Sequence, residues 1–93
     1  MERPSFSIVV PVYGVERYIR QCADTVLGQT YDKVQFIFVN DGTKDASMDV
    51  LNDLIEEKYS HLKDRIIIVN KENEGLPAAR RTGVMHATGD YIL

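Results

Sequence analysis

Three runs rich in β-branched and aromatic residues most constrain the fold of this chain: Phe6–Pro11, Val34–Val39 and Arg65–Val69. Such runs, bounded by turn residues, are typical of strands buried on both faces, as in a parallel sheet. The second run ends abruptly in polar residues, with Asp41 followed by Gly42. A buried strand at this position would place Asp41 at the carboxyl edge of the sheet, where open α/β folds bind ligands.

Segments between these runs carry apolar residues at three- and four-residue spacing, which predicts helices over 15–29, 47–59 and 77–87. A fourth strand begins near Asp90. We expect the first strand to stop at Pro11, because proline has no N–H to donate to a neighbouring strand. Strictly alternating strands and helices predict an α/β, Rossmann-like parallel sheet with helices on both faces.

Composition excludes several classes of function. The net charge is −3 and no basic block is present, so we expect no nucleic-acid partner. No apolar run is long enough to cross a bilayer, and the N-terminus lacks the apolar core of a signal peptide. The single cysteine, Cys22, lies in an apolar helical pattern, so we expect it to be buried in the core.

Common catalytic and nucleotide-binding motifs are missing from the sequence. We find no Gly-x-Gly-x-x-Gly after the first strand, no Gly-x-x-x-x-Gly-Lys and no Gly-x-Ser-x-Gly. Histidine and cysteine do not occur at metal-ligand spacing. The chain therefore lacks the signatures of dinucleotide-binding proteins, P-loop proteins and serine hydrolases.

The predicted topology gathers four polar side chains at one edge of the sheet. Tyr13 follows the first strand, Asp41 the second, and Asn73 and Arg80 the third. An aromatic ring, a carboxylate, an amide and a cation suit a nucleotide, and the start of the third helix offers N–H groups to an anion. Taken singly, each residue also fits a structural role: Tyr13 in packing, Asp41 in a turn, Asn73 in a loop and Arg80 at the surface.

The chain resembles the family-2 glycosyltransferases with the GT-A fold, in four segments that occur in the family's order and spacing. These segments are Ser7–Tyr13, Gln29–Tyr31, Val39–Asp45 and Asn73–Arg80, and the likeness continues through Gly83 and Ala87–Ile92.

This resemblance implies specific roles for the residues at the carboxyl edge. Pro11 and Tyr13 would line the pocket for the base of a nucleotide sugar. Asp41 would accept a hydrogen bond from an N–H of the base, and Arg80 would lie on the base or phosphate side. The family's strand order is 3-2-1-4, with the nucleotide at the switch point between strands one and four.

Two further residues, Glu16 and Asn73, stand where the family often contacts the ribose or the base. The sequence also departs from the family pattern. Gly14 replaces a frequent asparagine, Asn40 replaces the first of two acids, and Arg81 replaces an asparagine.

The resemblance also implies a reaction. A sugar would be transferred, with inversion, from a UDP-sugar to a hydroxyl of a glycan or lipid-linked acceptor. The family's Asp-x-Asp motif, which holds Mg²⁺ or Mn²⁺ on the diphosphate, is expected just after Leu93. Residues 1–93 would then be the N-terminal nucleotide-binding half of a domain truncated before this motif, without catalytic residues and inactive alone. The implied location is the cytoplasm, including the inner face of the membrane.

A non-enzymatic α/β module, such as a receiver-like signalling domain, is the alternative. Receiver domains need clustered acids after the first strand, where this chain has Pro11–Gly14. We also expect the chain to self-associate, because the fourth strand would leave an open sheet edge beside uncovered apolar surface.

Overall fold

The computed structural model describes residues 3–93 as one α/β unit. Its elements, in chain order, are β1 (Phe6–Val12), α1 (Ile19–Leu27), β2 (Val34–Asp41), α2 (Ser47–Lys58), the 3₁₀ helix η1 (Ser60–Arg65), β3 (Ile66–Lys71), α3 (Leu76–His86) and β4 (Tyr91–Ile92).

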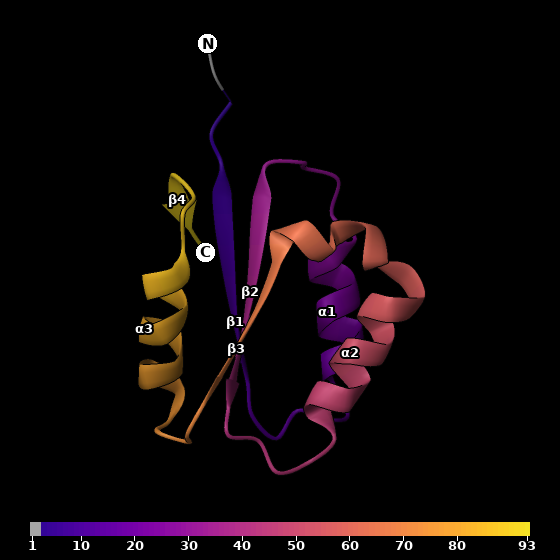
Figure 1. Cartoon of the computed structure of the whole chain (residues 1–93), viewed down its shortest axis with the longest axis vertical. Helices are drawn as coiled ribbons and strands as arrows, with labels where there is room; N and C mark the ends of the chain where they lie inside the picture. The colour runs from indigo at the N-terminus through magenta and orange to yellow at the C-terminus, as the bar shows by residue number, and fades with distance from the viewer. Residues whose placement is uncertain (1–2) are drawn as a thin grey trace.

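The four strands form one parallel sheet in the order β3-β2-β1-β4, which confirms the predicted order 3-2-1-4. Helices α1 and α2 cover one face of this sheet and α3 covers the other (Figure 1). The predicted Rossmann-like architecture, with helices on both faces, is therefore confirmed.

Alternate residues of β2 build two separate cores. Phe36 and Phe38 pack with α1 and α2 on one face, whereas Ile37 and Val39 pack with Ala79 of α3 on the other. All four of these β2 side chains are fully buried, as expected for a central strand. Asp41 ends the strand two residues after Val39, so the pleat directs its side chain to the α3 face.

The prediction that the first strand stops at Pro11 was wrong, because β1 continues to Val12. Phe6 donates its N–H toward β2, at Lys33 O, and Val9 donates toward β4, at Leu93 O. Because N–H directions alternate along a strand, the nitrogen of Pro11 points to the β4 side. The pairing with β4 reaches only Ser7, so no ladder bond is lost at Pro11.

The prediction that Cys22 is buried was wrong, because its side chain is exposed on α1. The buried stripe of α1 consists of Ile19, Ala23 and Leu27, at four-residue spacing. Cys22 is one position away from Ala23, which turns it about 100° around the helix and out of the core. The helix also begins four residues later than predicted, after a turn in which Val15 O accepts the N–H of Ile19.

Helix α3 lies unusually close to the sheet at Gly83. A Cβ atom on Gly83 would stand 2.3 Å from Cγ1 of Val9 and 3.2 Å from Cγ2 of Val39. This contact is a packing reason for a glycine in the helix interior, where glycine costs about 1 kcal/mol relative to alanine. It also brings the N-terminal end of α3 over the ends of β1 and β2.

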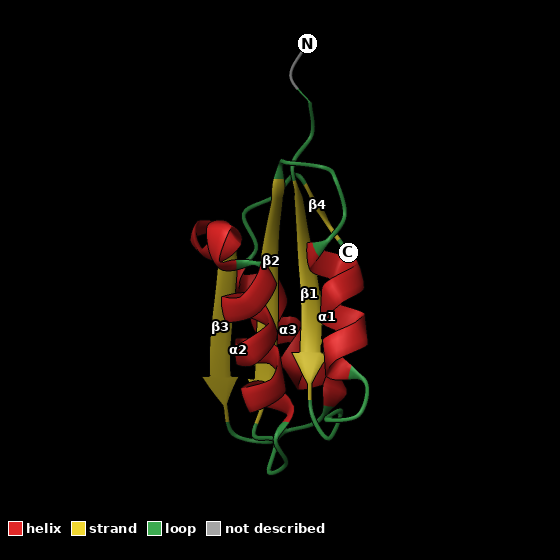
Figure 2. Cartoon of the chain, turned by 90° about the vertical axis from the view of Figure 1, so that its right-hand side faces the viewer, coloured by secondary structure: helices red, strands yellow, loops and turns green. Residues whose placement is uncertain are grey.

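The loops after β1, β2 and β3 all lie at the lower edge of the sheet in Figure 2, where the arrowheads point. This carboxyl edge is where the sequence predicts a ligand site. Within residues 3–93, we find no helix with the length and apolar character needed to cross a membrane.

Candidate functional site

A pocket of about 450 Å³ opens at the carboxyl edge, between the loop after β1 and the beginning of α3. Its lining is mainly apolar, with polar groups from three residues, as in most small-molecule sites. The lining residues are Pro11, Tyr13, Val15, Asp41, Asn73, Gly75, Leu76 and Ala79. Four of the six predicted site residues, Pro11, Tyr13, Asp41 and Asn73, therefore share one pocket.

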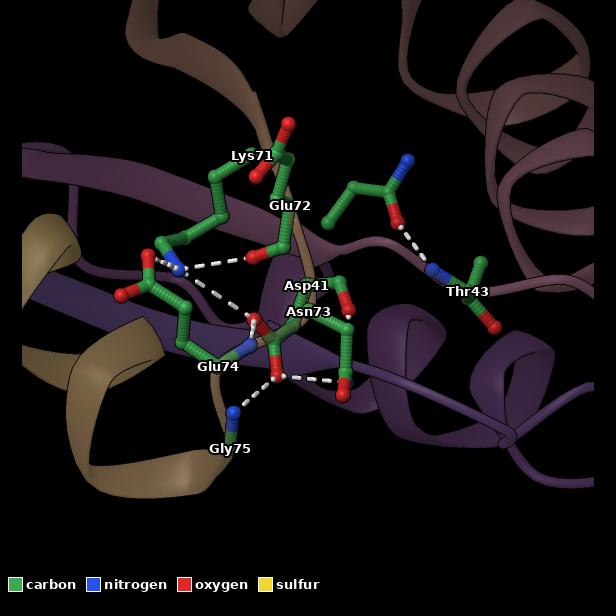
Figure 3. Close-up of polar contacts among 8 residues, drawn as sticks. Asp41, Thr43, Lys71, Glu72, Asn73, Glu74 and Gly75 are labelled. Atoms are coloured by element: carbon green, nitrogen blue, oxygen red, sulfur yellow. Dashed lines mark hydrogen bonds and ion pairs between the residues drawn. The ribbon is translucent and has the colours of Figure 1, made fainter.

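The Asp41 carboxylate is the polar centre of this site, although the residue is only 2% exposed. Its Oδ1 accepts hydrogen bonds from the N–H of Glu74, at 3.1 Å, and from Nζ of Lys71, at 3.4 Å. Its Oδ2 accepts from the N–H of Gly75, at 3.0 Å, and from Nδ2 of Asn73, at 3.2 Å (Figure 3). Two oxygens thus receive four donors, the full capacity of a carboxylate.

These donors keep Asp41 ionised. Burial alone would raise the pKa of this carboxyl group, but the hydrogen bonds from the Glu74 and Gly75 amides and from Lys71 outweigh burial, and the pKa is lowered. The carboxylate is therefore an anion at neutral pH, with the β3–α3 loop folded around it.

Lys71, the last residue of β3, holds the other side of this arrangement. Its ammonium donates to Oε1 of Glu74 at 2.7 Å and to the main-chain oxygen of Glu72 at 2.9 Å, in addition to Asp41. The side chain of Lys71 is only 13% exposed. The Glu74 carboxylate raises the pKa of Lys71 most, burial lowers it, and with Asp41 the balance is upward.

Two glycines shape the backbone around Asp41. Gly42 has φ +69°, and a Cβ atom there would stand 2.7 Å from the nitrogen of Asn73. Gly75, the N-cap of α3, has φ +96°. Both need a conformation that other residues rarely adopt, and Gly42 also lets the β3–α3 loop approach the end of β2.

The loop after β1 is tied to the loop after β2, and Glu16 belongs to this tie. Oε1 of Glu16 accepts a hydrogen bond from the main-chain N–H of Ala46 at 2.9 Å. The main-chain N–H of Glu16 donates to Oδ2 of Asp45 at 3.3 Å. The N–H of Gly14 donates to Oγ1 of Thr43 at 2.9 Å. Glu16 does not line the pocket, so the structure places it as a support of the loop that carries Tyr13.

Arg80 also lies outside the pocket lining, one residue beyond Ala79 on α3. Its side chain is exposed and forms no ion pair within residues 3–93. The predicted ligand contacts of Glu16 and Arg80 therefore remain predictions, since neither residue joins the other four in the pocket.

Sequence reasoning missed the apolar part of the lining, formed by Val15, Leu76 and Ala79. The small residues of the third predicted helix allow a close approach either to the sheet or to a ligand, and nothing in the sequence distinguishes Leu76 from a core residue. Lys71 was also missed, because a single lysine at a strand end is ordinarily a surface residue.

This arrangement suits a flat, partly polar ligand. Tyr13 is 52% exposed and lines the pocket with its aromatic side chain, together with the Asp41 carboxylate and the Asn73 amide, which are hydrogen-bonded to each other. Residues 3–93 contain no group of three or more His, Cys, Asp or Glu side chains placed to hold a metal ion.

Fold and site together define an α/β domain whose pocket lies at the carboxyl edge of its parallel sheet, among the segments that follow β1, β2 and β3. The profile of Glycosyl transferase family 2 matches residues 7–93, and the chain belongs to this family. This result removes the receiver-like alternative.

Known relatives and a solved structure agree with this placement. The chain is 40% identical over 86 residues to "Glycosyltransferase GlyA" of Streptococcus pneumoniae. This alignment covers 92% of the chain and 12% of GlyA. It is 42% identical over 89 residues to "Uncharacterized glycosyltransferase EpsJ" of Bacillus subtilis, covering 96% of this chain and 24% of EpsJ.

The mannosyltransferase PcManGT of Pyrobaculum calidifontis, solved with GDP-Man and Mn²⁺, superposes with a TM-score of 0.85 at 24% identity. The superposition covers 99% of this chain and 27% of PcManGT. It establishes the shared glycosyltransferase fold. In all three comparisons the chain spans about a quarter or less of the other protein's length.

Proposed function

We propose that this chain is the donor-binding part of a glycosyltransferase, and that its pocket holds the nucleotide of a UDP-sugar. One observation carries the proposal: Pro11, Tyr13, Asp41 and Asn73, which come from three separate strand ends, line a single pocket. Family membership supplies the chemical class of the ligand.

In this proposal the base lies against the Tyr13 ring, with Pro11 and Leu76 also lining its pocket. The base directs an N–H group to the Asp41 carboxylate. The diphosphate lies toward the start of α3, where Pro77 occupies the first turn and unpaired N–H groups favour an anion.

The four donors on Asp41 determine how a base reaches the carboxylate. Oδ2 bonds to Asn73 and Gly75, which line the pocket, whereas Lys71 and Glu74, the partners of Oδ1, do not. The Asn73 amide also donates to the main-chain oxygen of Asp41 at 3.0 Å, and so keeps a partner if it leaves Oδ2. We therefore propose that an N–H of the base replaces the Asn73 amide as a hydrogen-bond donor to Oδ2 of Asp41.

The whole protein would transfer the sugar to an acceptor hydroxyl with inversion, and the acceptor would be a glycan or a lipid-linked glycan. The structure of PcManGT, which has a related fold, contains a nucleotide sugar, GDP-Man, and Mn²⁺. This supports a nucleotide-sugar donor and a divalent cation, Mg²⁺ or Mn²⁺, for the whole protein. Residues 3–93 do not form a cation site, so we assign no step through a cation to them. An Asp-x-Asp motif after Leu93 remains part of the proposal, as does a location in the cytoplasm or at the inner face of the membrane.

Titration of the isotopically labelled 93-residue chain with UDP, followed by NMR, tests the nucleotide site. We expect the amides of Tyr13, Asn73 and Gly75 to shift, and Asp41→Asn to weaken binding about tenfold or more through loss of a charged acceptor. Asp53→Asn, at an exposed position on α2, is the matched control and should bind as the unaltered chain does. A parallel titration with GDP tests the choice of base.

Shifts confined to residues outside the pocket would refute the proposed site. Equal UDP affinity of the Asp41→Asn and Asp53→Asn variants would refute the role of the Asp41 carboxylate. Stronger binding of GDP than of UDP would correct the base while leaving the site in place.

A further inference from the structure

Lys71 stands behind the pocket rather than in it. It is absent from the lining, yet its ammonium lies 3.4 Å from Oδ1 of Asp41, whose other oxygen bonds to pocket residues. Figure 3 shows the Lys71 ammonium on one side of this carboxylate and the Asn73 amide on the other.

The three N–H groups of the Lys71 ammonium have three acceptors at distinct places. One is the carboxylate at the end of β2, and the other two, the main-chain oxygen of Glu72 and the side chain of Glu74, belong to the loop that follows Lys71 itself. The Lys71 ammonium therefore links the 72–75 loop to the end of β3, which carries Lys71, and to the end of β2, which carries Asp41.

This tie fixes the wall of the pocket. The same loop supplies Asn73 and Gly75 to the lining, and the N–H groups of Glu74 and Gly75 to Asp41. A largely buried ammonium with a full set of acceptors costs little desolvation relative to an unpaired one, and it holds its partners in one geometry.

We propose that Lys71 is a positioning residue for donor binding: through Asp41 Oδ1 and Glu74, its ammonium holds the carboxylate and the 72–75 loop in the arrangement that forms the nucleotide pocket. This inference rests on the proposed function in naming a nucleotide as the ligand. The geometry of the tie does not depend on that function.

Other charged groups do not replace Lys71. Within residues 3–93 the only cation paired with Asp41 is Lys71, and the only other anion paired with Lys71 is Glu74. Arg80 and Arg81 lie on α3, which packs against β1 and β2, but neither forms an ion pair in this part of the chain.

Substitution Lys71→Met tests the proposal, because methionine keeps the length of the side chain and removes its charge. We expect the ¹³C titration of the Asp41 carboxyl to move to higher pH, and amide exchange at Glu74 and Gly75 to accelerate. UDP affinity at neutral pH should fall about tenfold, and its loss on acidification should begin at a higher pH. Lys44→Met, at an exposed position in the loop after β2, should change none of these.

An unchanged Asp41 titration in a folded Lys71→Met variant would overturn the proposal. If that variant does not fold, the unaltered chain decides: the Lys71 ammonium should titrate above the ordinary lysine value of 10.5, and a value at or below it would overturn the tie. If the unaltered chain binds neither UDP nor GDP, the proposed function fails together with the nucleotide role of Lys71. The Asp41 titration would still show whether Lys71 holds the carboxylate.

Discussion

The side-chain amide of Asn73 donates to both the main-chain oxygen and the carboxylate of Asp41, at 3.0 and 3.2 Å. The end of β2 and the loop after β3 are therefore joined through one pair of residues that are 32 positions apart. The pocket depends on this join, because both residues line it.

Gly42→Ala should separate the two segments. Its Cβ would meet the Asn73 nitrogen at 2.7 Å, and φ +69° is itself strained for alanine. We expect a loss of about 2–4 kcal/mol in the free energy of unfolding, measured with urea, and weaker UDP binding. Gly14→Ala is the matched control, since Gly14 has φ +62° but open space around it, and should cost only about 1–2 kcal/mol. Equal losses would contradict a steric role for Gly42.

Tyr13→Ala should weaken UDP binding by about 1–3 kcal/mol, the usual contribution of a base stacked on an aromatic ring. Tyr18→Ala provides the comparison, because Tyr18 is an exposed tyrosine of the same loop that does not line the pocket. Calorimetric titration of both variants with UDP measures the two losses of binding free energy. A similar loss in the two would show that the Tyr13 ring does not contact the base.

Gly83→Ala should destabilise the chain, although alanine is the better helix former by about 1 kcal/mol. The added methyl would stand 2.3 Å from Cγ1 of Val9, so we expect a net loss of about 1–3 kcal/mol in urea unfolding. Val9→Ala removes the colliding methyl groups. The double variant should therefore lose less stability than the sum of the single variants, and strict additivity would argue against this contact.

Asp45 makes the stability of the β1–α1 and β2–α2 loops depend on pH. Hydrogen bonds from the side chains of Ser47 and Thr43 lower the pKa of its carboxyl from 3.8 to about 2. A pKa lowered by folding stabilises the folded state above pH 3.8, and this contribution is lost as the pH falls toward 2. Asp45→Asn should be less stable than the unaltered chain at pH 7, and the difference should shrink on acidification. Acid-unfolding curves that stay parallel would contradict this, and Asp53→Asn is the control.

Self-association is expected at the β4 edge. Tyr91, Ile92 and Leu93 are exposed there, and Val84 and Met85 of α3 are also exposed. Sedimentation at increasing concentration should show a dimer or a larger assembly of this chain, and Ile92→Lys should weaken it by placing a charge on the edge. A monomer at all concentrations would contradict the prediction.

Sequence patterns predicted the elements well where burial was complete. The run around Phe36 forms the predicted strand, because β2 is a central parallel strand with apolar residues buried on both faces. Errors arose where a boundary depended on neighbours. Pro11 stays in β1 because β4, the strand on the side of its nitrogen, pairs only as far as Ser7, and Cys22 is exposed because it lies one residue off the buried stripe of α1.

By itself, the sequence determined the alternating α/β order, the family, and which strand ends carry Tyr13, Asp41 and Asn73. These are local properties of periodicity and motif. Tertiary structure alone decided that Glu16 supports a loop, that Arg80 lies outside the pocket, and that Lys71 is tied to Asp41. Such relationships depend on which backbone N–H groups and side chains meet across neighbouring strands. The spacing of residues along the sequence does not specify which of them come within hydrogen-bond distance.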